Sequence, residues 1–276
     1  MVLAATLLSL AAAVLHAAWN LLAKQSPVDR FVALWAQFLT AGILSAVALV
    51  ALDGLPTSGI LWATATGVIH VPYCWYLAKA YASGDFSVVY PIARGGGAAL
   101  AGLGGVVFLG DRISLLGFLA MLVVCIGIVM LAGRASRAEV MMAGVVALSI
   151  AAYTVVDAQG ARTADTPKYA LAVFVSCASW ITLFGVCTGR ASQLAMAVRC
   201  HAPRFVAAGC FSLASYTLVI AALRLAPTGY VAALRESSVV LAALVGTAYL
   251  GEGHARQRVT AAGVVLSGLI MLVIVR

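Results

Sequence analysis

Residues 86–109 read FSVVYPIARGGGAALAGLGGVVFL, an apolar run that carries one permanent cation, Arg94. A helix rises about 1.5 Å per residue, so roughly 20 residues cross the ~30 Å hydrocarbon core of a bilayer. The run is apolar on all sides, whereas the strands of a membrane barrel alternate apolar and polar residues. The stretch therefore predicts a transmembrane helix.

The rest of the chain has the same character. Of its 276 residues, 64% are hydrophobic and 9% are charged, whereas about 25% are charged in a typical soluble domain. Breaking the sequence at Pro, Gly and charged clusters gives ten apolar spans. They are 2–22, 31–52, 59–80, 86–109, 113–132, 139–160, 168–188, 204–223, 228–250 and 257–275. We expect an all-α membrane protein of ten transmembrane helices, with no room left for a soluble domain.

Comparison of the sequence with itself reveals an internal repeat. An arginine, a Leu-Gly-acid triplet and a glycine recur at a constant offset of 141 residues. The matched positions are Arg94 with Arg235, 109–111 (LGD) with 250–252 (LGE), and Gly127 with Gly268. We expect two five-helix halves, residues 1–134 and 135–276. Because five is odd, the second half enters the membrane from the opposite side, and such inverted repeats are typical of transporters with a central cavity.

The net charge of +8 does not indicate nucleic-acid binding, because the cations lie singly at span ends and form no basic patch. They are better understood as topology markers. Ten Lys and Arg residues fall in the odd-numbered connections and five on the other side. The positive-inside rule then places both termini outside the cytoplasm.

Motifs for enzyme chemistry are missing from the sequence. It contains no GxSxG, HExxH or acidic metal-binding motif, and its six cysteines lack CxxC or histidine spacing. We interpret the cysteines as small packing residues. The sequence predicts neither an enzyme nor a metal site nor a cofactor.

Arg94 lies about 12 Å in from its span end, where an unpaired cation costs at least ~2.5 kcal/mol. One interpretation is a structural arginine that bonds backbone carbonyls loosened by Pro91; the other is a site for a substrate anion. Its copy Arg235 is followed by Glu236, also inside a span. For Glu236, a structural ion pair, substrate binding and coupling to protons all remain open.

Pro91 and the glycine run after Arg94 weaken the same helix. Gly95, Gly96 and Gly97 allow a neighbouring backbone to approach closely, or allow a bend that opens and closes a gate. No GK[ST] follows, so the run is not a phosphate loop.

The first span carries polar residues on one face. His16, Asn20 and Lys24 are spaced four apart, and Trp19 lies beside His16. We expect Lys24 at the interface, His16 and Asn20 bridging helices or touching substrate, and His16 as a further candidate for proton coupling.

Aromatic residues within the spans are candidates for a ligand cage, although interfacial belts and ordinary packing also use them. The candidate substrate-binding aromatics are Trp19, Trp75, Tyr90, Tyr153 and Tyr216. Asp157, one turn after Tyr153, is also a candidate for carrying protons, but it lies near a span end, so we expect it on a solvated face.

Four segments resemble one known family: HAAWNLLAK (16–24), GDFSVVYPIARG (84–95), the LGD and LGE endings, and LAPTGYVAALRESSVV (225–240). Together they resemble the EamA-like branch of the drug/metabolite transporter superfamily, across essentially the whole chain. The resemblance implies a bacterial inner-membrane carrier that works by alternating access and mostly exports amino acids, metabolites or amphiphilic compounds. Family members usually have both termini in the cytoplasm, opposite to the charge count.

The leading hypothesis is a carrier of a small polar or zwitterionic metabolite such as an amino acid. Arg94 or Arg235 would meet its carboxylate, and Glu236 or the aromatics its amine. The runner-up is a phosphate-bearing or lipid-linked sugar, because paired arginines also suit phosphate. An intramembrane lipid enzyme, a channel and a purely structural membrane protein have less support. The expected partners are the substrate, the bilayer and a coupling proton.

Overall fold

The computed structural model describes residues 2–56, 58–82, 86–130, 137–238, 240 and 255–275. Ten helices and no strand occur in these ranges. The helices are α1 (Val2–Lys24), α2 (Arg30–Ala51), α3 (Ile60–Ala82), α4 (Phe86–Leu109), α5 (Leu115–Met130), α6 (Arg137–Thr163), α7 (Thr166–Cys187), α8 (Ala191–Leu225), α9 (Thr228–Arg235) and α11 (Ala255–Ile274). The all-helical prediction is confirmed, and α4 has the bounds expected for it.

The helices have the character of membrane spans. Five of them, α1, α2, α6, α7 and α8, are long and apolar enough to cross a bilayer, and α4, α5 and α11 contain shorter apolar segments. Large apolar side chains face outward, among them Val50 (81% exposed), Leu61 (83%) and Phe108 (77%). A soluble monomer rarely exposes apolar surface on this scale, so the chain is a helical membrane protein.

Local sequence explains where helices begin. Asp29 caps α2, since its carboxylate accepts hydrogen bonds from the backbone N–H groups of Phe31 and Val32. α7 carries a proline in its first turn, where the missing N–H is not needed.

α8 differs from the expected span 204–223. It begins at Ala191, and its backbone is non-helical at His201 (φ −136°), two residues before Pro203. Proline lacks an N–H group and clashes with the preceding turn, which accounts for the kink. Leu194 and Ala197 of the added segment pack against α2. The polar residues between 191 and 203 had favoured a connection.

The predicted span 228–250 begins as expected with α9, and Glu236 forms the C-cap of that helix. Residues 241–254, including the LGE triplet, lie outside the described part of the chain. The correspondence between LGD and LGE therefore stays a prediction.

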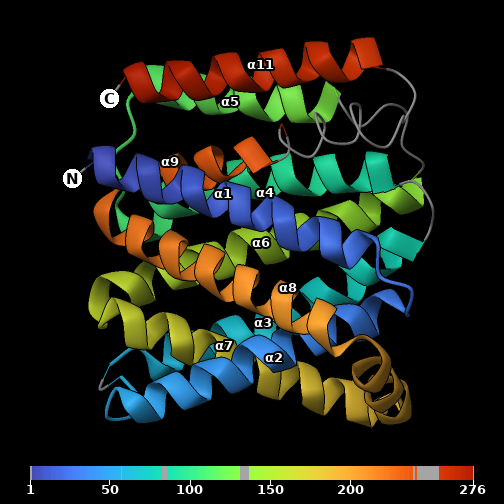
Figure 1. The fold of residues 1–276 in the computed structure, drawn as a ribbon. Coiled ribbons are helices and arrows are strands. Elements are labelled where there is room, and N and C mark those ends of the chain that lie inside the picture. The colour runs from blue at the N-terminus through green and yellow to red at the C-terminus, as the bar shows by residue number, and fades with distance from the viewer. Residues whose placement is uncertain are drawn as a thin grey trace.

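The helices pack in matched pairs, seen as layers in Figure 1. The contact of α1 with α8 has a counterpart in that of α6 with α3. The contact of α3 with α7 likewise has a counterpart in that of α8 with α2. α2 with α7, α4 with α9 and α5 with α11 also pack directly. The α5 and α11 pair forms one outer layer and α2 with α7 the other, and the two chain ends lie on the same side of the bundle (Figure 1).

The contact between α5 and α11 is reciprocal. A Cβ atom on Gly127 would lie 2.8 Å from Val265 Cγ2, and one on Gly268 would lie 2.8 Å from Val124 Cγ2. Val124 and Val265 are 141 residues apart, as are the two glycines. The two helices thus approach through glycines in equivalent positions, as in the close packing of membrane helices.

Candidate functional site

Arg94 of α4 and Glu236 at the end of α9 form a two-pronged ion pair. Arg94 Nη2 lies 2.6 Å from Glu236 Oε1, and Arg94 Nε lies 3.1 Å from Oε2. Both side chains are 3% exposed. Parallel N–H···O bonds of this kind are the strongest arrangement of guanidinium and carboxylate. The geometry favours the structural interpretation of both residues.

Arg235, next to Glu236, is in a different situation. Its residue is 6% exposed, and its Nε is buried without a hydrogen-bond partner. Within the described residues, no ion pair or hydrogen bond engages this guanidinium, whose Cζ lies 6.0 Å from the centre of the Tyr216 ring. A buried charge without a partner is costly and is normally matched by an anion or water.

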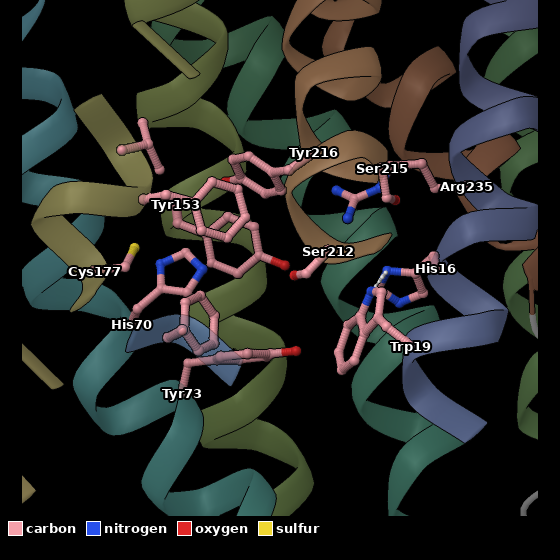
Figure 2. Close-up of a pocket in the computed structure, with 13 residues that line it drawn as sticks. His16, Trp19, His70, Tyr73, Tyr153, Cys177, Ser212, Ser215, Tyr216 and Arg235 are labelled. Carbon is pink, nitrogen blue, oxygen red and sulfur yellow. Dashed lines mark hydrogen bonds between the residues drawn. The ribbon is translucent and has the colours of Figure 1, made fainter. Parts of the chain in front are cut away.

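Arg235 faces a cavity among seven helices, α1, α2, α3, α6, α7, α8 and α9. The cavity comprises about 440 Å³ of empty space, part of it open to the outside. Its lining is His16, Trp19, Phe38, His70, Tyr73, Tyr153, Val173, Phe174, Cys177, Ser212, Ser215, Tyr216 and Arg235. Figure 2 shows the guanidinium of Arg235 pointing toward the tyrosines across this space. Among the described residues of this lining, Arg235 alone carries a permanent charge.

Aromatic rings form the wall opposite Arg235. The His70 ring centre lies 4.5 Å from that of Tyr153, 5.4 Å from Tyr73 and 6.4 Å from Tyr216. His70 Nδ1 donates to the backbone oxygen of Thr66 at 2.8 Å. Because a carbonyl only accepts, Nδ1 carries the hydrogen in this arrangement and Nε2 is left to accept one.

His16 and Trp19 form the side of the cavity contributed by α1. Trp19 Nε1 donates to His16 Nδ1 at 3.2 Å, and the two rings meet edge to face. Asn20 is not part of the lining; its amide donates to the His16 backbone oxygen at 2.8 Å. Of the three predicted site residues of this helix, His16 and Trp19 thus line the cavity and Asn20 does not.

Trp75 lies away from the cavity. Its ring packs between Lys79 Nζ at 4.9 Å and Arg190 Cζ at 5.0 Å, with Phe31 and Phe184 against it. This environment at the end of α3 is typical of an interfacial tryptophan.

The predicted gating residues fall on a continuous helix. α4 runs without a break through Gly95, Gly96 and Gly97. A Cβ on Gly97 would lie 2.7 Å from Ile150 Cγ2, whereas on Gly95 and Gly96 the nearest atoms would be at 3.4 Å. Close packing on α6 therefore accounts for Gly97. The side chains of Tyr90 and Pro91 lie outside the described part of the chain.

Asp157 corrects a prediction. It was expected on a solvated face, but it is 1% exposed. Its carboxylate accepts hydrogen bonds from Thr66 Oγ1 at 2.7 Å, Tyr169 OH at 2.9 Å and Tyr216 OH. The expectation failed because α6 extends to Thr163 and because α3, α7 and α8 close over the carboxylate.

A second ion pair fixes the start of α9. Arg162 Nη2 lies 2.7 Å from Asp111 Oδ1, and Asp111 Oδ2 accepts the backbone N–H of Thr228 at 2.7 Å. Gly110, with φ of +67°, turns the chain so that Asp111 can reach this helix end. The LGD ending of the sequence repeat therefore holds the helix that carries Arg235.

His70 and Tyr73 were not among the predicted site residues, although they form the centre of the aromatic wall. With only Cys74 one helical turn away, His70 has too few neighbouring ligands for a zinc site, so the metal-binding patterns did not single it out. The available signal was its position as an ionisable residue in the middle of an apolar span, which favours function.

Comparison with known proteins gives the fold alone. No family model and no curated protein matches the chain. Chains in solved structures do match, 27 in number. One, described only as the crystal structure of a protein, has a TM-score of 0.76 and 18% sequence identity, covering 100% of this chain and 99% of its own. At least one other protein therefore adopts this architecture over nearly its full length.

Proposed function

We propose that this protein is a secondary transporter of the drug/metabolite type, which moves a small carboxylate-bearing metabolite such as an amino acid by alternating access. The observation that carries the proposal is Arg235. It is a buried cation without an acidic partner among the described residues, and it points into a cavity walled by aromatic rings. A bound carboxylate supplies the missing counter-charge.

The proposed architecture is ten transmembrane helices in two inverted five-helix halves, 1–134 and 135–276. Its support is the matched packing of α1 on α8 with α6 on α3, together with the reciprocal glycine contacts of α5 and α11. Equivalent contacts in both directions are what a two-fold relation between two halves produces. The EamA-like sequence segments support a bacterial inner membrane and export as the direction.

The cavity suggests how a zwitterion would bind. Glu236 is engaged by Arg94, so it is not available for an amine. The amine would instead meet the ring faces of Tyr73 and Tyr153, with His70 Nε2 as an acceptor. The hydrophobic part of the substrate would pack on Trp19 and Phe174, which also line the space.

The phosphate-bearing alternative has less support from this geometry. A phosphate favours two arginines, but the charge of Arg94 is already balanced by a buried carboxylate. Only Arg235 among the described lining residues offers a permanent positive charge.

Counterflow in proteoliposomes tests the proposal with matched compounds. Labelled L-phenylalanine is the probe, and the competitors are 3-phenylpropionate, which lacks the amine, phenethylamine, which lacks the carboxylate, and glucose 6-phosphate. We expect competition by 3-phenylpropionate and none by phenethylamine. Competition by glucose 6-phosphate alone would favour the phosphate alternative, and failure of every carboxylate in a wider metabolite panel would refute the proposal.

Variants locate the carboxylate site. Arg235→Gln should weaken apparent affinity by about 10- to 100-fold, because a hydrogen-bonded contact to a charged group contributes about 1.5–3 kcal/mol. Arg235→Lys keeps the charge and should lose less. Arg190→Gln is the matched control, since Arg190 pairs with Asp29 at a partly exposed site away from the cavity. Equal losses for Arg235→Gln and Arg190→Gln would contradict the assignment.

A further inference from the structure

Asp157 is a buried carboxylate that the proposed substrate site does not use. Its three hydrogen-bond donors come from three different helices: Thr66 from α3, Tyr169 from α7 and Tyr216 from α8. All three are hydroxyl groups. Hydroxyls stabilise an ionised carboxylate but do not balance its charge.

The titratable groups that interact with Asp157 are Tyr153 on α6 itself, Tyr169 and Cys177 on α7, Tyr216 on α8 and Arg235 on α9. The other helices packed on α6 carry His70 and Cys74 (α3) and Arg94 (α4). Two of these are permanent cations. Arg94 is engaged by Glu236, and no described cation lies within ion-pair distance of Asp157. Its negative charge is therefore left to hydroxyl groups and to the field of Arg235.

Tyr216 connects Asp157 to the cavity. Its hydroxyl bonds Asp157 Oδ2, its ring lines the cavity, and the guanidinium of Arg235 lies 6.0 Å from the ring centre. Figure 2 shows the guanidinium of Arg235 directed toward the Tyr216 ring. A single aromatic ring thus lies between the buried carboxylate and the proposed anion site.

We propose that Asp157 is the proton-binding site of this transporter, and that a proton on Asp157 and a carboxylate at Arg235 bind cooperatively. The carboxylate at Arg235 rests on the proposed function, whereas proton binding at Asp157 is argued from the hydrogen bonds and burial of Asp157 alone. Asp157, the residue that had been expected on a solvated face, replaces the two leading sequence-based candidates for coupling, His16 and Glu236. Glu236 has both oxygens engaged by Arg94, and His16 Nδ1 is occupied by Trp19.

Protonation changes the hydrogen bonds in a defined way. The ionised carboxylate accepts three bonds, whereas a proton delivered to Oδ2 by a hydronium ion, which leaves as water, makes this oxygen a donor to the Tyr216 hydroxyl. The hydroxyl hydrogen of Tyr216 stays on its oxygen but no longer points at Asp157, so it can turn toward another acceptor. No covalent bond other than that to the proton forms or breaks.

Electrostatics act in the same direction. A proton removes the negative charge on the far side of the Tyr216 ring, so Arg235 attracts an anion more strongly. By linkage, a bound anion then favours the proton to the same extent. Substrate carboxylate and proton would travel together, so export would require an outward substrate gradient that outweighs any inward proton gradient.

The first test titrates Asp157 without any substrate. Infrared difference spectra of the protein in nanodiscs, recorded through the neutral pH range, reveal the C=O stretching band of a protonated carboxyl. We expect a band that appears as the pH falls, disappears in Asp157→Asn and shifts in Tyr216→Phe, which keeps the ring and removes one donor. Asp165→Asn alters an exposed carboxylate at the start of α7 and should leave the band unchanged. Absence of a titrating band in the wild type overturns the proposal, whether or not the Asp157 variant folds.

The second test measures coupling with L-phenylalanine in proteoliposomes. An acid-outside gradient should raise uptake in the wild type about tenfold, a typical size for coupling between two sites. Asp157→Asn should retain counterflow and lose the response to the gradient. If wild-type counterflow operates but ignores the gradient, the coupling proposal is wrong and the proposed function stands. If no carboxylate shows counterflow, the proposed function fails, and the infrared titration still decides whether Asp157 binds a proton.

Discussion

Arg94 and Glu236, far apart in the sequence, form a buried ion pair in which two guanidinium nitrogens bind the two carboxylate oxygens. Because Glu236 is engaged in this way, the neighbouring Arg235 has no acidic partner among the described residues. Arg94, Arg235 and Glu236 together thus carry one net positive charge. That residual charge is what the proposed substrate neutralises.

Removal of Glu236 should be strongly destabilising. Glu236→Gln leaves Arg94 buried without a counter-charge, which typically costs about 3–5 kcal/mol. The double variant Arg94→Gln/Glu236→Gln removes both charges and should recover most of that loss. Thermal unfolding in nanodiscs measures both. Equal destabilisation of the single and double variants would show that the loss does not come from the unpaired charge of Arg94.

The α5 and α11 contact predicts equal effects at two distant positions. Gly127→Ala and Gly268→Ala each place a Cβ within 2.8 Å of a valine backbone nitrogen, which cannot move like a side chain. We expect each to cost about 1–3 kcal/mol in unfolding experiments. Gly263→Ala, on α11 with no atom within 4 Å, is the control and should be close to neutral. Very different losses at 127 and 268 would argue against a two-fold relation.

Two substitutions at Asp111 separate its hydrogen bond to the start of α9 from its ion pair with Arg162. Asp111→Asn keeps an oxygen for the Thr228 N–H and loses the charge opposite Arg162, whereas Asp111→Ala loses both. The alanine variant should be less stable by a further ~1 kcal/mol, the usual contribution of a helix cap. It should also lower counterflow, because α9 positions Arg235. Asp165→Ala, at an N-cap that makes no side-chain cap bond, should change neither property.

Substitutions in the glycine run 95–97 test whether these residues allow close helix packing or a bend in α4. Gly97→Ala should cost about 1–3 kcal/mol through its overlap with Ile150, and Ile150→Ala should make the two losses less than additive. Gly96→Ala, whose Cβ would meet Ala147 at 3.4 Å, should leave stability nearly unchanged. A loss of counterflow in Gly96→Ala at full stability would instead indicate a hinge.

Helix positions could be predicted from the sequence because each span is a continuous apolar run between breaking residues. Residues 86–109 illustrate this, since their predicted and observed bounds coincide. The early start of α8 could not be predicted in this way. Its first turns contain the polar residues Ser192, Gln193 and Arg199, and the helix there is explained by packing of Leu194 and Ala197 against α2, which the sequence alone does not reveal.

The pairing within the site depends on three-dimensional contacts. Successive residues on a helix point about 100° apart, so Arg235 and Glu236 face different neighbours although they are adjacent. Whether Glu236 pairs with Arg235 or Arg94 is therefore decided by where α4 lies. The burial of Asp157 has the same origin, since three helices distant in sequence cover it.

α9 is attached to α4 at both of its ends. Asp111, just beyond α4, holds the first residue of α9, and Arg94 holds Glu236 at its last turn, while a Cβ on Gly229 would lie 2.8 Å from the Gly102 Cα between them. Because α4 and α9 are connected at three points, we expect them to move together. In the proposed transport cycle, Arg235 would then keep its position relative to α4, and access would alternate through movement of α1, α6 and α8 against this pair of helices.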